Sequence, residues 1–344
     1  MPNPEQQPVT TLKLEGKSNW IFNLAQYREL ALAGFIGLLI VILSARNPTF
    51  LTFTNFKDIL LDISILAMIA LAQSLAIITR GIDLSVASML ALTAMMVSFV
   101  VRAYPDTPLL LLVFLGLGLG SVLGSFNGLI IAVGKVPPII ATLGTLSVYR
   151  GLVFLYSNGS WINAFEMPNS FKELAKNSPF ALPNLVLVAV FVAILFYVFL
   201  NHTRAGRDIY TLGSNPEAAQ ISGIQTDQVR FMVYLISGLI CGLAGVLWAS
   251  RYAAAQTDTA LGFELQTVAA AVIGGVSMLG GVGTVPGVLL GALVLGIIQN
   301  GLILSGISPF WQSAVQGFLI LLALVSDSTI QQRIKGTVTR RLKQ

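Results

Sequence analysis

Few residues in this chain could act as catalysts or metal ligands. His202 is the only histidine and Cys241 the only cysteine, which excludes a histidine-rich metal site and a Ser/His or Cys/His catalytic pair. The glycine-rich stretch Gly280–Gly287 lacks the lysine that a phosphate-binding loop requires. Proton-coupled carriers need ionisable relays within the membrane, and the apolar segments hold almost no carboxylates. We therefore expect no catalytic residue, cofactor or metal, and an external energy source.

One polar stretch, Asn201–Arg230, has a well-defined local pattern. It is the longest polar interval between two strongly apolar segments. Asn215 suits an N-cap, Pro216 the first helical position, and Glu217 the positive start of a helix. Gly223 can end such a helix or allow close backbone approach. The pattern predicts a short capped helix within a long loop.

The surface of this predicted helix is small and smooth. Ala218 and Ala219 follow Glu217 directly, and together they leave a shape that a partner's cleft can enclose. We interpret the loop as a cytosolic handle held by a separate motor protein. An ordinary capped turn without a partner is the alternative.

The composition indicates an all-α integral membrane protein. Hydrophobic residues make up 55% of the chain and charged residues 10%, with a mean hydropathy of +0.81. A soluble domain carries about 25% charged residues. The pI of 9.4 does not indicate nucleic-acid binding, because the basic residues lie at the ends of apolar runs rather than in a patch. That distribution is typical of a protein in a lipid bilayer.

About ten transmembrane helices are predicted, since a bilayer core of about 30 Å requires roughly 20 helical residues. The candidate spans are 30–45, 59–79, 84–101, 109–134, 138–156, 184–200, 229–250, 267–281, 285–304 and 310–326. The fifth contains Arg150 and the eighth is short and glycine-rich, so either could be broken or re-entrant. Residues 1–29 are expected to form a cytosolic tail with an interfacial helix over Trp20–Leu30, for which a plain aromatic anchor ahead of the first span is the alternative. Residues 30–326 would form the membrane domain, and residues 327–344 a basic cytosolic tail.

The basic residues predict that both termini are cytosolic. Thirteen then lie inside and six outside, as the positive-inside rule requires. The inner set is Lys13, Lys17, Arg28, Arg80, Lys135, Arg204, Arg207, Arg230, Arg333, Lys335, Arg340, Arg341 and Lys343, and the outer set is Arg46, Lys57, Arg102, Lys172, Lys176 and Arg251. This orientation also places the Asn201–Arg230 loop in the cytosol.

Glycines at intervals of four predict close helix contacts, because small residues form a groove for a neighbouring backbone. They are Gly116, Gly120, Gly124 and Gly128, then Gly238 and Gly242, then Gly283, Gly287 and Gly291. The sequence Asn-Gly-Leu-Ile occurs at Asn127 and again at Asn300, five candidate spans apart. An odd offset reverses the orientation, so this echo indicates an inverted repeat of the kind found in transporters.

Uncharged polar groups within or beside the spans could line a path for a hydroxyl-rich solute. The candidates are Asn127, Thr142, Thr145, Gln299, Asn300, Gln312 and Gln316, together with Arg150. Such groups also link helices by hydrogen bonds, and this alternative stays open for each. Arg150 could line the outer mouth or serve as an anchor that reaches outward.

Two further sets of polar residues lie at span ends. Asp83 and Ser85 open the third span, where they could form a hinge or gate, or cap the first amides. Arg251, Asp258 and Glu264 lie in a long outer loop and could dock a soluble partner through rim charges. The alternative for this loop is an ordinary solvated segment. Lys172 and Lys176 occupy a second outer loop of the same kind.

Several long motifs resemble one transporter family. They are GSNPEAAQISGI, SGLICGLAGVLWASRY (Ser237–Tyr252), RGIDLSVAS (Arg80–Ser88), ATLGTLSVYRGL (Ala141–Leu152), AAVIGGVSMLGGVGTVPGVLLGAL (Ala270–Leu293) and QNGLILSGISPFWQ (Gln299–Gln312). Together they resemble the permease subunits of ATP-binding-cassette importers for ribose, xylose, rhamnose and autoinducer-2, over residues 50 to 326. The segments SRYAAAQTDTALGFEL and ISPFWQ are most similar to the rhamnose and autoinducer-2 branch. Ala87 stands where many relatives have glycine, which affects only local packing.

The resemblance implies a permease in a bacterial inner membrane that is not itself an enzyme. Its implied partners are a cytosolic ATP-binding subunit, a periplasmic sugar-binding protein, and a second copy or paralogue of the permease. Glu217, Ala218, Ala219 and Gly223 would form the coupling helix held by the ATPase. A self-sufficient carrier or channel for a small polar solute is the alternative, and an integral-membrane enzyme is disfavoured because no acid, base and nucleophile cluster is present.

Overall fold

The computed structural model describes residues 28–177 and 182–308, together with residues 311, 314, 315, 317, 318 and 321. Within these residues the regular elements are helices. One isolated antiparallel bridge pairs Ile162 with Ala255 in the loops between them. In a bilayer a helix satisfies its own backbone hydrogen bonds, so apolar runs of this length fold as helices. The expected all-α class is confirmed.

The helices of the described residues follow in this order. They are α2 (Arg28–Arg46), η1 (Pro48–Leu51), α3 (Phe53–Ile78), α4 (Val86–Ala103), α5 (Leu109–Ala132), α6 (Pro138–Ser157), η2 (Ala164–Glu166), α7 (Asn169–Lys176), α8 (Asn184–His202), α9 (Arg204–Ser214), α10 (Pro216–Ile221), α11 (Thr226–Tyr252), α12 (Phe263–Ile273) and α13 (Val285–Leu304). Eight of those helices are long and apolar enough to cross a membrane. They are α2, α3, α4, α5, α6, α8, α11 and α13.

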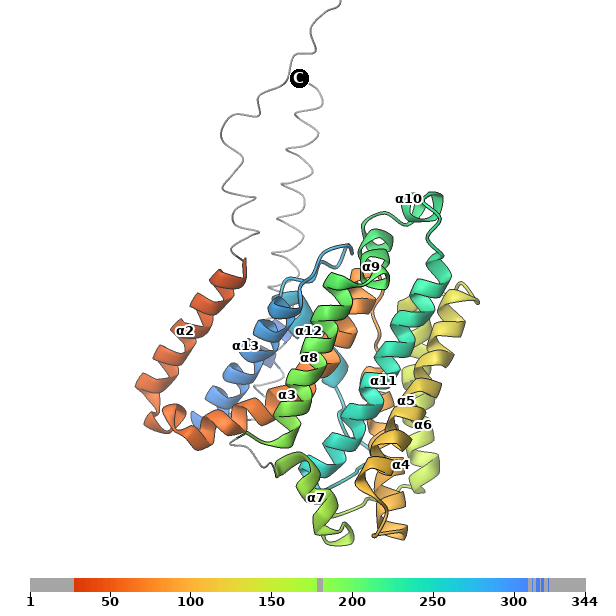
Figure 1. The fold of residues 1–344 in the computed structure, drawn as a ribbon. Helices are drawn as coiled ribbons and strands as arrows, with labels where there is room; N and C mark the ends of the chain where they lie inside the picture. Colours follow the sequence, from red (N-terminus) through yellow and green to blue (C-terminus); the bar gives the residue numbers. More distant parts are fainter. Residues whose placement is uncertain are drawn as a thin grey trace, which may run out of the picture.

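The long helices form a bundle with two distinct ends (Figure 1). Helices α9 and α10 lie at the top of Figure 1, which we call the α10 end, and α7 lies at the bottom, the α7 end. The first residues of α2 lie toward the α10 end. Between the start of α2 and α9 the chain passes through six spans. An even number of crossings returns the chain to the end where it began, so α9 lies at the same end as the start of α2.

The two doubtful spans have different outcomes. The fifth is an unbroken 20-residue helix, α6. The eighth is broken: α12 has only 11 residues and ends at Ile273. Positive φ angles at Gly275, Gly280 and Gly281 prevent the helix from continuing through this glycine-rich stretch. Most of the tenth span, including Gln312 and Gln316, lies outside the described residues, as do most of the predicted interfacial helix and the C-terminal tail.

The glycine repeats pack as predicted. Added Cβ atoms at Gly120 and Gly238 would each collide with the other helix's backbone, so α5 and α11 touch backbone to backbone. Gly291 of α13 meets Ala270 of α12 in the same way. This close packing confirms the role of small residues where no hydrophobic effect drives helix association.

Helices α5 and α13, which carry the repeated Asn-Gly-Leu-Ile sequence, run in opposite directions. Beyond α5, Lys135 pairs with Asp227 near the start of α11 at the α10 end. The last residue of α13, Leu304, accepts a 3.0 Å hydrogen bond from Asn47, just after α2 at the other end. Opposite directions are what an inverted repeat requires.

Candidate functional site

Helix α10 is the short capped helix predicted from the sequence. The Asn215 side chain accepts hydrogen bonds from the amides of Glu217 at 3.0 Å and Ala218 at 3.1 Å. Pro216 occupies the first turn, and Gly223 has a φ of +83° just beyond the end of the helix. An added Cβ at Gly223 would meet no atom within 4 Å. Gly223 is therefore required for its positive φ rather than for close approach.

The exposed surface of α10 differs in part from the prediction. Glu217 and Ala218 are exposed, whereas Ala219 is fully buried against its own chain. The smooth surface is therefore formed by Ala218 and not by Ala219. Ile221 is 88% exposed at the end of α10, an exposed apolar residue that sequence reasoning missed. Its signal was an isoleucine placed between the polar residues Gln220 and Ser222.

Helix α9 was also missed, because an amphipathic helix of 11 residues is short and only partly apolar. Ile209 and Leu212 are buried one turn apart, which is the spacing that could have revealed it. The Thr203 side chain caps the start by accepting from the Gly206 amide at 3.0 Å. Burial raises the pKa of the Tyr210 phenol, so this hydroxyl stays protonated. It donates to the Gly283 carbonyl oxygen at 2.8 Å.

A buried polar group, the Asp83 cluster, joins four elements inside the bundle. It consists of Asp83, Ser85, Asn127, Tyr149 and Ser237, all buried. The Asp83 carboxylate accepts from the Ser85 hydroxyl at 2.6 Å and from Ser237 of α11 at 2.8 Å. Asn127 of α5 donates to the Ser85 hydroxyl at 2.7 Å and accepts from Tyr149 of α6 at 3.1 Å. The hydrogen bonds of Ser237, Asn127 and Tyr149 all cross between segments, whereas those from Ser85 to Asp83 are local.

The capping alternative is wrong for Ser85. Ser85 is the N-cap residue of α4 but makes no side-chain cap bond. Its backbone is helical, at φ −82° and ψ −8°, rather than in the β region of a capping residue, and its hydroxyl is engaged by Asp83 and Asn127. The Asp83 carboxylate does accept a hydrogen bond from the Ser85 backbone amide, at 3.0 Å. The geometry therefore favours an interhelix link at this position.

The two threonines proposed for a solute path also bond within the chain. The Thr142 hydroxyl lies 2.9 Å from the Pro138 carbonyl oxygen and 3.1 Å from that of Ile82. Thr145 lies 3.4 Å from the Thr142 carbonyl oxygen, and both threonines are buried. The Thr142 contact with Ile82 favours the helix-linking alternative for Thr142, since it ties α6 to the segment that precedes α4. The Thr145 contact stays within α6.

Asn300 is engaged in a similar way. Its amide and that of Asn55 exchange two hydrogen bonds, at 2.8 Å and 3.0 Å, between α13 and α3. Gln299 donates to the Gln266 side chain at 3.4 Å. Both contacts again link helices.

Arg150 is an anchor for the loop that follows α11. Its guanidinium donates to the carbonyl oxygens of Thr257 at 3.2 Å and Thr259 at 2.8 Å. The Trp161 indole lies 3.4 Å from the Thr257 hydroxyl. Of the two interpretations of Arg150, the outward-reaching anchor is favoured, because carbonyl oxygens supply the partners that a guanidinium in a membrane helix needs.

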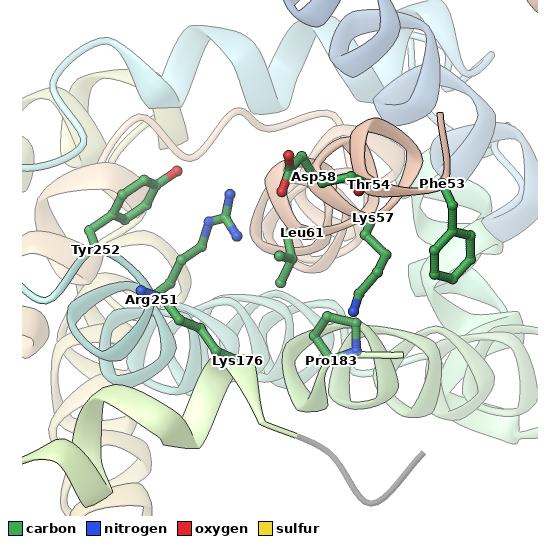
Figure 2. A pocket seen from close by; sticks show the side chains of 9 residues that line it. All are labelled: Phe53, Thr54, Lys57, Asp58, Leu61, Lys176, Pro183, Arg251 and Tyr252. Atoms are coloured by element: carbon green, nitrogen blue, oxygen red, sulfur yellow. The ribbon is translucent and has the colours of Figure 1, made fainter. Parts of the chain in front are cut away.

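A charged pocket of about 530 Å³ opens near the α7 end (Figure 2). Its lining comes from α3, α7, the start of α8 and α11, and comprises Phe53, Thr54, Lys57, Asp58, Leu61, Lys176, Pro183, Arg251 and Tyr252. Arg251 lies in it and forms an ion pair with Asp62. Asp258 is exposed and Glu264 half-buried, and neither lines the pocket. Sequence reasoning missed Lys57 and Asp58, because basic residues near a span end usually only anchor it.

Comparisons with known proteins agree with this architecture. Residues 55–324 match the family described as branched-chain amino acid transport system / permease component. The ribose import permease protein RbsC of Escherichia coli is 38% identical over 296 residues, covering 86% of this chain and 92% of that protein. The autoinducer 2 import system permease protein LsrC of an Enterobacter species is 34% identical over 90% of both chains.

A third relative is the galactose/methyl galactoside import permease protein MglC of Haemophilus influenzae, 34% identical over 85% of this chain and 91% of its own. No solved structure matches the chain significantly. The family match covers most of the chain, and these relatives align over nearly their whole length. The chain therefore belongs to this family of importer permeases, as a multi-pass protein of the inner membrane.

Proposed function

We propose that this chain is the permease subunit of an ATP-driven, binding-protein-dependent importer of a simple sugar. Both termini and α10 would lie in the cytosol, and the α7 end would face the periplasm. The family supports a permease component of a transport system, and the names of its relatives support sugar import. The orientation is supported by the excess of basic residues on the side of the termini.

The observation that carries this proposal is α10, a capped helix whose exposed face belongs to Glu217, Ala218 and Ile221. A cytosolic ATP-binding subunit would enclose this face in a cleft. Ile221 supplies apolar contact, and Glu217 supplies charge at a helix start, where an anion is stabilised. Gly223 allows the chain to turn back into α11. ATP-driven closure of the partner would displace α10 and tilt the spans on either side.

Reconstitution in vesicles tests this proposal. With the ATP-binding subunit and the sugar-binding protein present, the wild-type chain should import sugar only when ATP is supplied. A Glu217→Lys variant should insert normally but lose about tenfold in uptake, equivalent to about 1.4 kcal/mol of interaction. Wild-type uptake in this variant would contradict the coupling role.

A self-sufficient carrier remains the alternative function. Its discriminating result is uptake by vesicles that contain only this chain, with no ATP-binding subunit. The proposed importer predicts no uptake there. The same preparation, solubilised and sized, tests whether the permease acts as two copies or with a paralogue, as the resemblance implies.

The charged pocket at the α7 end is the proposed docking point for the sugar-binding protein. The side chains of Lys57 and Lys176 line this pocket. Their amines would form ion pairs with carboxylates of the sugar-binding protein and guide its approach. Arg251 already pairs with Asp62, so it would contribute as part of an ion pair rather than as a lone cation. Asp258 would contribute from the neighbouring exposed loop, and Glu264 from the start of α12.

The sequence favours a rhamnose- or autoinducer-2-like sugar over ribose or xylose. The autoinducer-2 relative supports that preference, whereas the ribose relatives align with higher identity. Competition between labelled rhamnose and an excess of unlabelled ribose in the vesicle assay decides between them. Rhamnose uptake that survives the ribose excess supports the preference, and uptake abolished by ribose contradicts it.

A further inference from the structure

Three segments far apart in the sequence meet backbone to backbone at the α10 end. They are Ile78–Gly81 at the end of α3, Gly213–Ser214 at the end of α9, and Gly280–Gly281 after α12. The Gly281 amide donates to the Ile78 carbonyl oxygen at 2.9 Å. We call this contact the junction.

The junction has no room for side chains at its centre. A Cβ at Gly213 would lie 2.6 Å from the Gly281 nitrogen and would collide with the Ile78 carbonyl oxygen. A Cβ at Gly280 would lie 2.8 Å from that same oxygen, and Gly280 and Gly281 both have positive φ angles. Because packed backbones cannot deform continuously, a shift of one segment must move the others.

Arg80 fastens the junction to the segment that leads into α10. Its Nε donates to the Gly213 carbonyl oxygen and its Nη2 to that of Ser214, each at 2.6 Å. Ser214 directly precedes Asn215, the residue that caps α10. The guanidinium also sits at the carbonyl end of α9, where a cation is favoured. Arg80 itself has a φ of +65°, an uncommon conformation that persists only where the surroundings hold it.

The Arg80 backbone continues into the interior of the bundle. Three residues further on is Asp83, whose carboxylate binds Ser237 of α11. Through Ser85 the same cluster reaches Asn127 of α5 and Tyr149 of α6. A continuous series of contacts therefore runs from the start of α10, through Arg80, to the helices of the membrane domain.

We propose that Arg80 is a positioning residue that transmits displacement of α10 to the Asp83 cluster and so to α4. This inference rests on the proposed function, since it takes an ATP-driven movement of α10 as its input. The segment between Arg80 and Asp83 is not helical, so it can shift without breaking a helical hydrogen-bond ladder. Coupling of this kind requires a physical network with two arrangements.

The test measures movement of α4 in the assembled transporter. Spin labels at Tyr104, the exposed residue directly after α4, and at Ile303, an exposed residue of α13, report the position of α4. Their separation is compared between the nucleotide-free complex and the complex trapped with ATP and vanadate. No sugar is needed for this readout.

Arg80→Gly is the decisive variant, because glycine adopts a φ of +65° without strain. The substitution therefore removes the guanidinium hydrogen bonds to Gly213 and Ser214 without straining the backbone. Arg207→Ala, an exposed arginine of α9, is the matched control. In the wild type and the control, the distance between the labels should change when the complex is trapped. In Arg80→Gly this change should be lost, although the variant should still bind the ATP-binding subunit and support its ATP hydrolysis. Arg80→Lys, which has one amine in place of the two guanidinium nitrogens that donate hydrogen bonds, should recover only part of the shift.

Three outcomes would overturn the inference. A shift of wild-type size in Arg80→Gly would show that the Arg80 hydrogen bonds do not transmit the movement of α10. An unmoved α4 in a wild-type complex that imports sugar with ATP would show that the input does not reach α4. Failure of wild-type vesicles to import sugar with ATP would overturn the proposed function itself, and the inference with it.

Discussion

The two ends of the bundle are held together by different kinds of contact. At the α10 end, backbones meet at Gly213 and Gly281, and carbonyl oxygens accept from Arg80 and Tyr210. At the α7 end, Arg251 pairs with Asp62 beside an open pocket and Arg102 pairs with Glu166. The α10 end also has one ion pair, Lys135 with Asp227, in addition to its backbone contacts. Backbone contacts are short and directional and depend little on salt, whereas exposed charge pairs are screened and adaptable.

This difference indicates a division of labour. A stiff contact between backbones transmits displacement, because no side chain can absorb the movement. Charges around a pocket suit repeated encounters with a soluble partner, because they speed association more than they strengthen it. We therefore assign transmission to the α10 end and recognition to the α7 end.

The largest expected effect comes from Gly213→Ala. The added methyl group would collide with Ile78 and approach Gly281, and overpacking of this kind costs about 1–3 kcal/mol or more. The control is Gly118→Ala in α5, where an added Cβ meets no atom within 4 Å. Thermal unfolding of the purified protein should show a lower Tm for Gly213→Ala alone. Equal Tm values for the two variants would break the comparison, because the α10 end would then be no stiffer than open helix surface.

Asn215→Ala should have the next largest effect, confined to α10. It removes the side-chain acceptor for the Glu217 and Ala218 amides, and the loss of such a cap costs about 1 kcal/mol. Hydrogen exchange of the α10 amides should accelerate about fivefold, as expected for about 1 kcal/mol of local opening. Asn215→Asp, which keeps an acceptor, should retain slow exchange. Equal acceleration in both variants would rule out the cap as the cause.

Lys57→Glu tests recognition at the α7 end. Reversing this charge should weaken attachment of the sugar-binding protein about tenfold at low salt, chiefly by slowing association. The effect should shrink at 0.5 M salt, where charges are screened within a few ångströms. Surface-plasmon measurements on the reconstituted permease at two salt concentrations provide the check. Arg207→Glu at the α10 end should leave this binding unchanged, and weakening by both variants would remove the distinction between the ends.

The smallest effect concerns acid sensitivity near α7. The Asn163 backbone amide, together with Arg102, holds the pKa of Glu166 below its usual value of 4.5. The lowered pKa contributes local stability above about pH 4.5, and this is lost as the pH falls through the lowered value. Fluorescence of the nearby Trp161 should change on acidification in the wild type, and Glu166→Gln should lack that change. An identical acid transition in both proteins would exclude Glu166 as its source.

Much of the architecture follows from the sequence, because bilayer thickness fixes the length of each span. Glycine spacing predicted close helix packing, though not which helices would meet, and capping residues predicted α10, since both patterns are local. The links through Arg80 and Asp83 were not predicted. Arg80 binds residues 133 and 134 positions away, and Asp83 binds Ser237 at a separation of 154. Such pairs depend on how whole helices pack, which periodicity alone does not encode.

The central claim is that α10 lies in the cytosol and is held by an ATP-binding subunit. The most direct measurement is labelling of an Ile221→Cys variant, since residue 221 is 88% exposed and the single native cysteine, Cys241, is buried. In intact cells a membrane-impermeant thiol reagent should not reach residue 221. In inverted membranes it should react, and added ATP-binding subunit should block it. Labelling of intact cells from the periplasmic side would contradict the account.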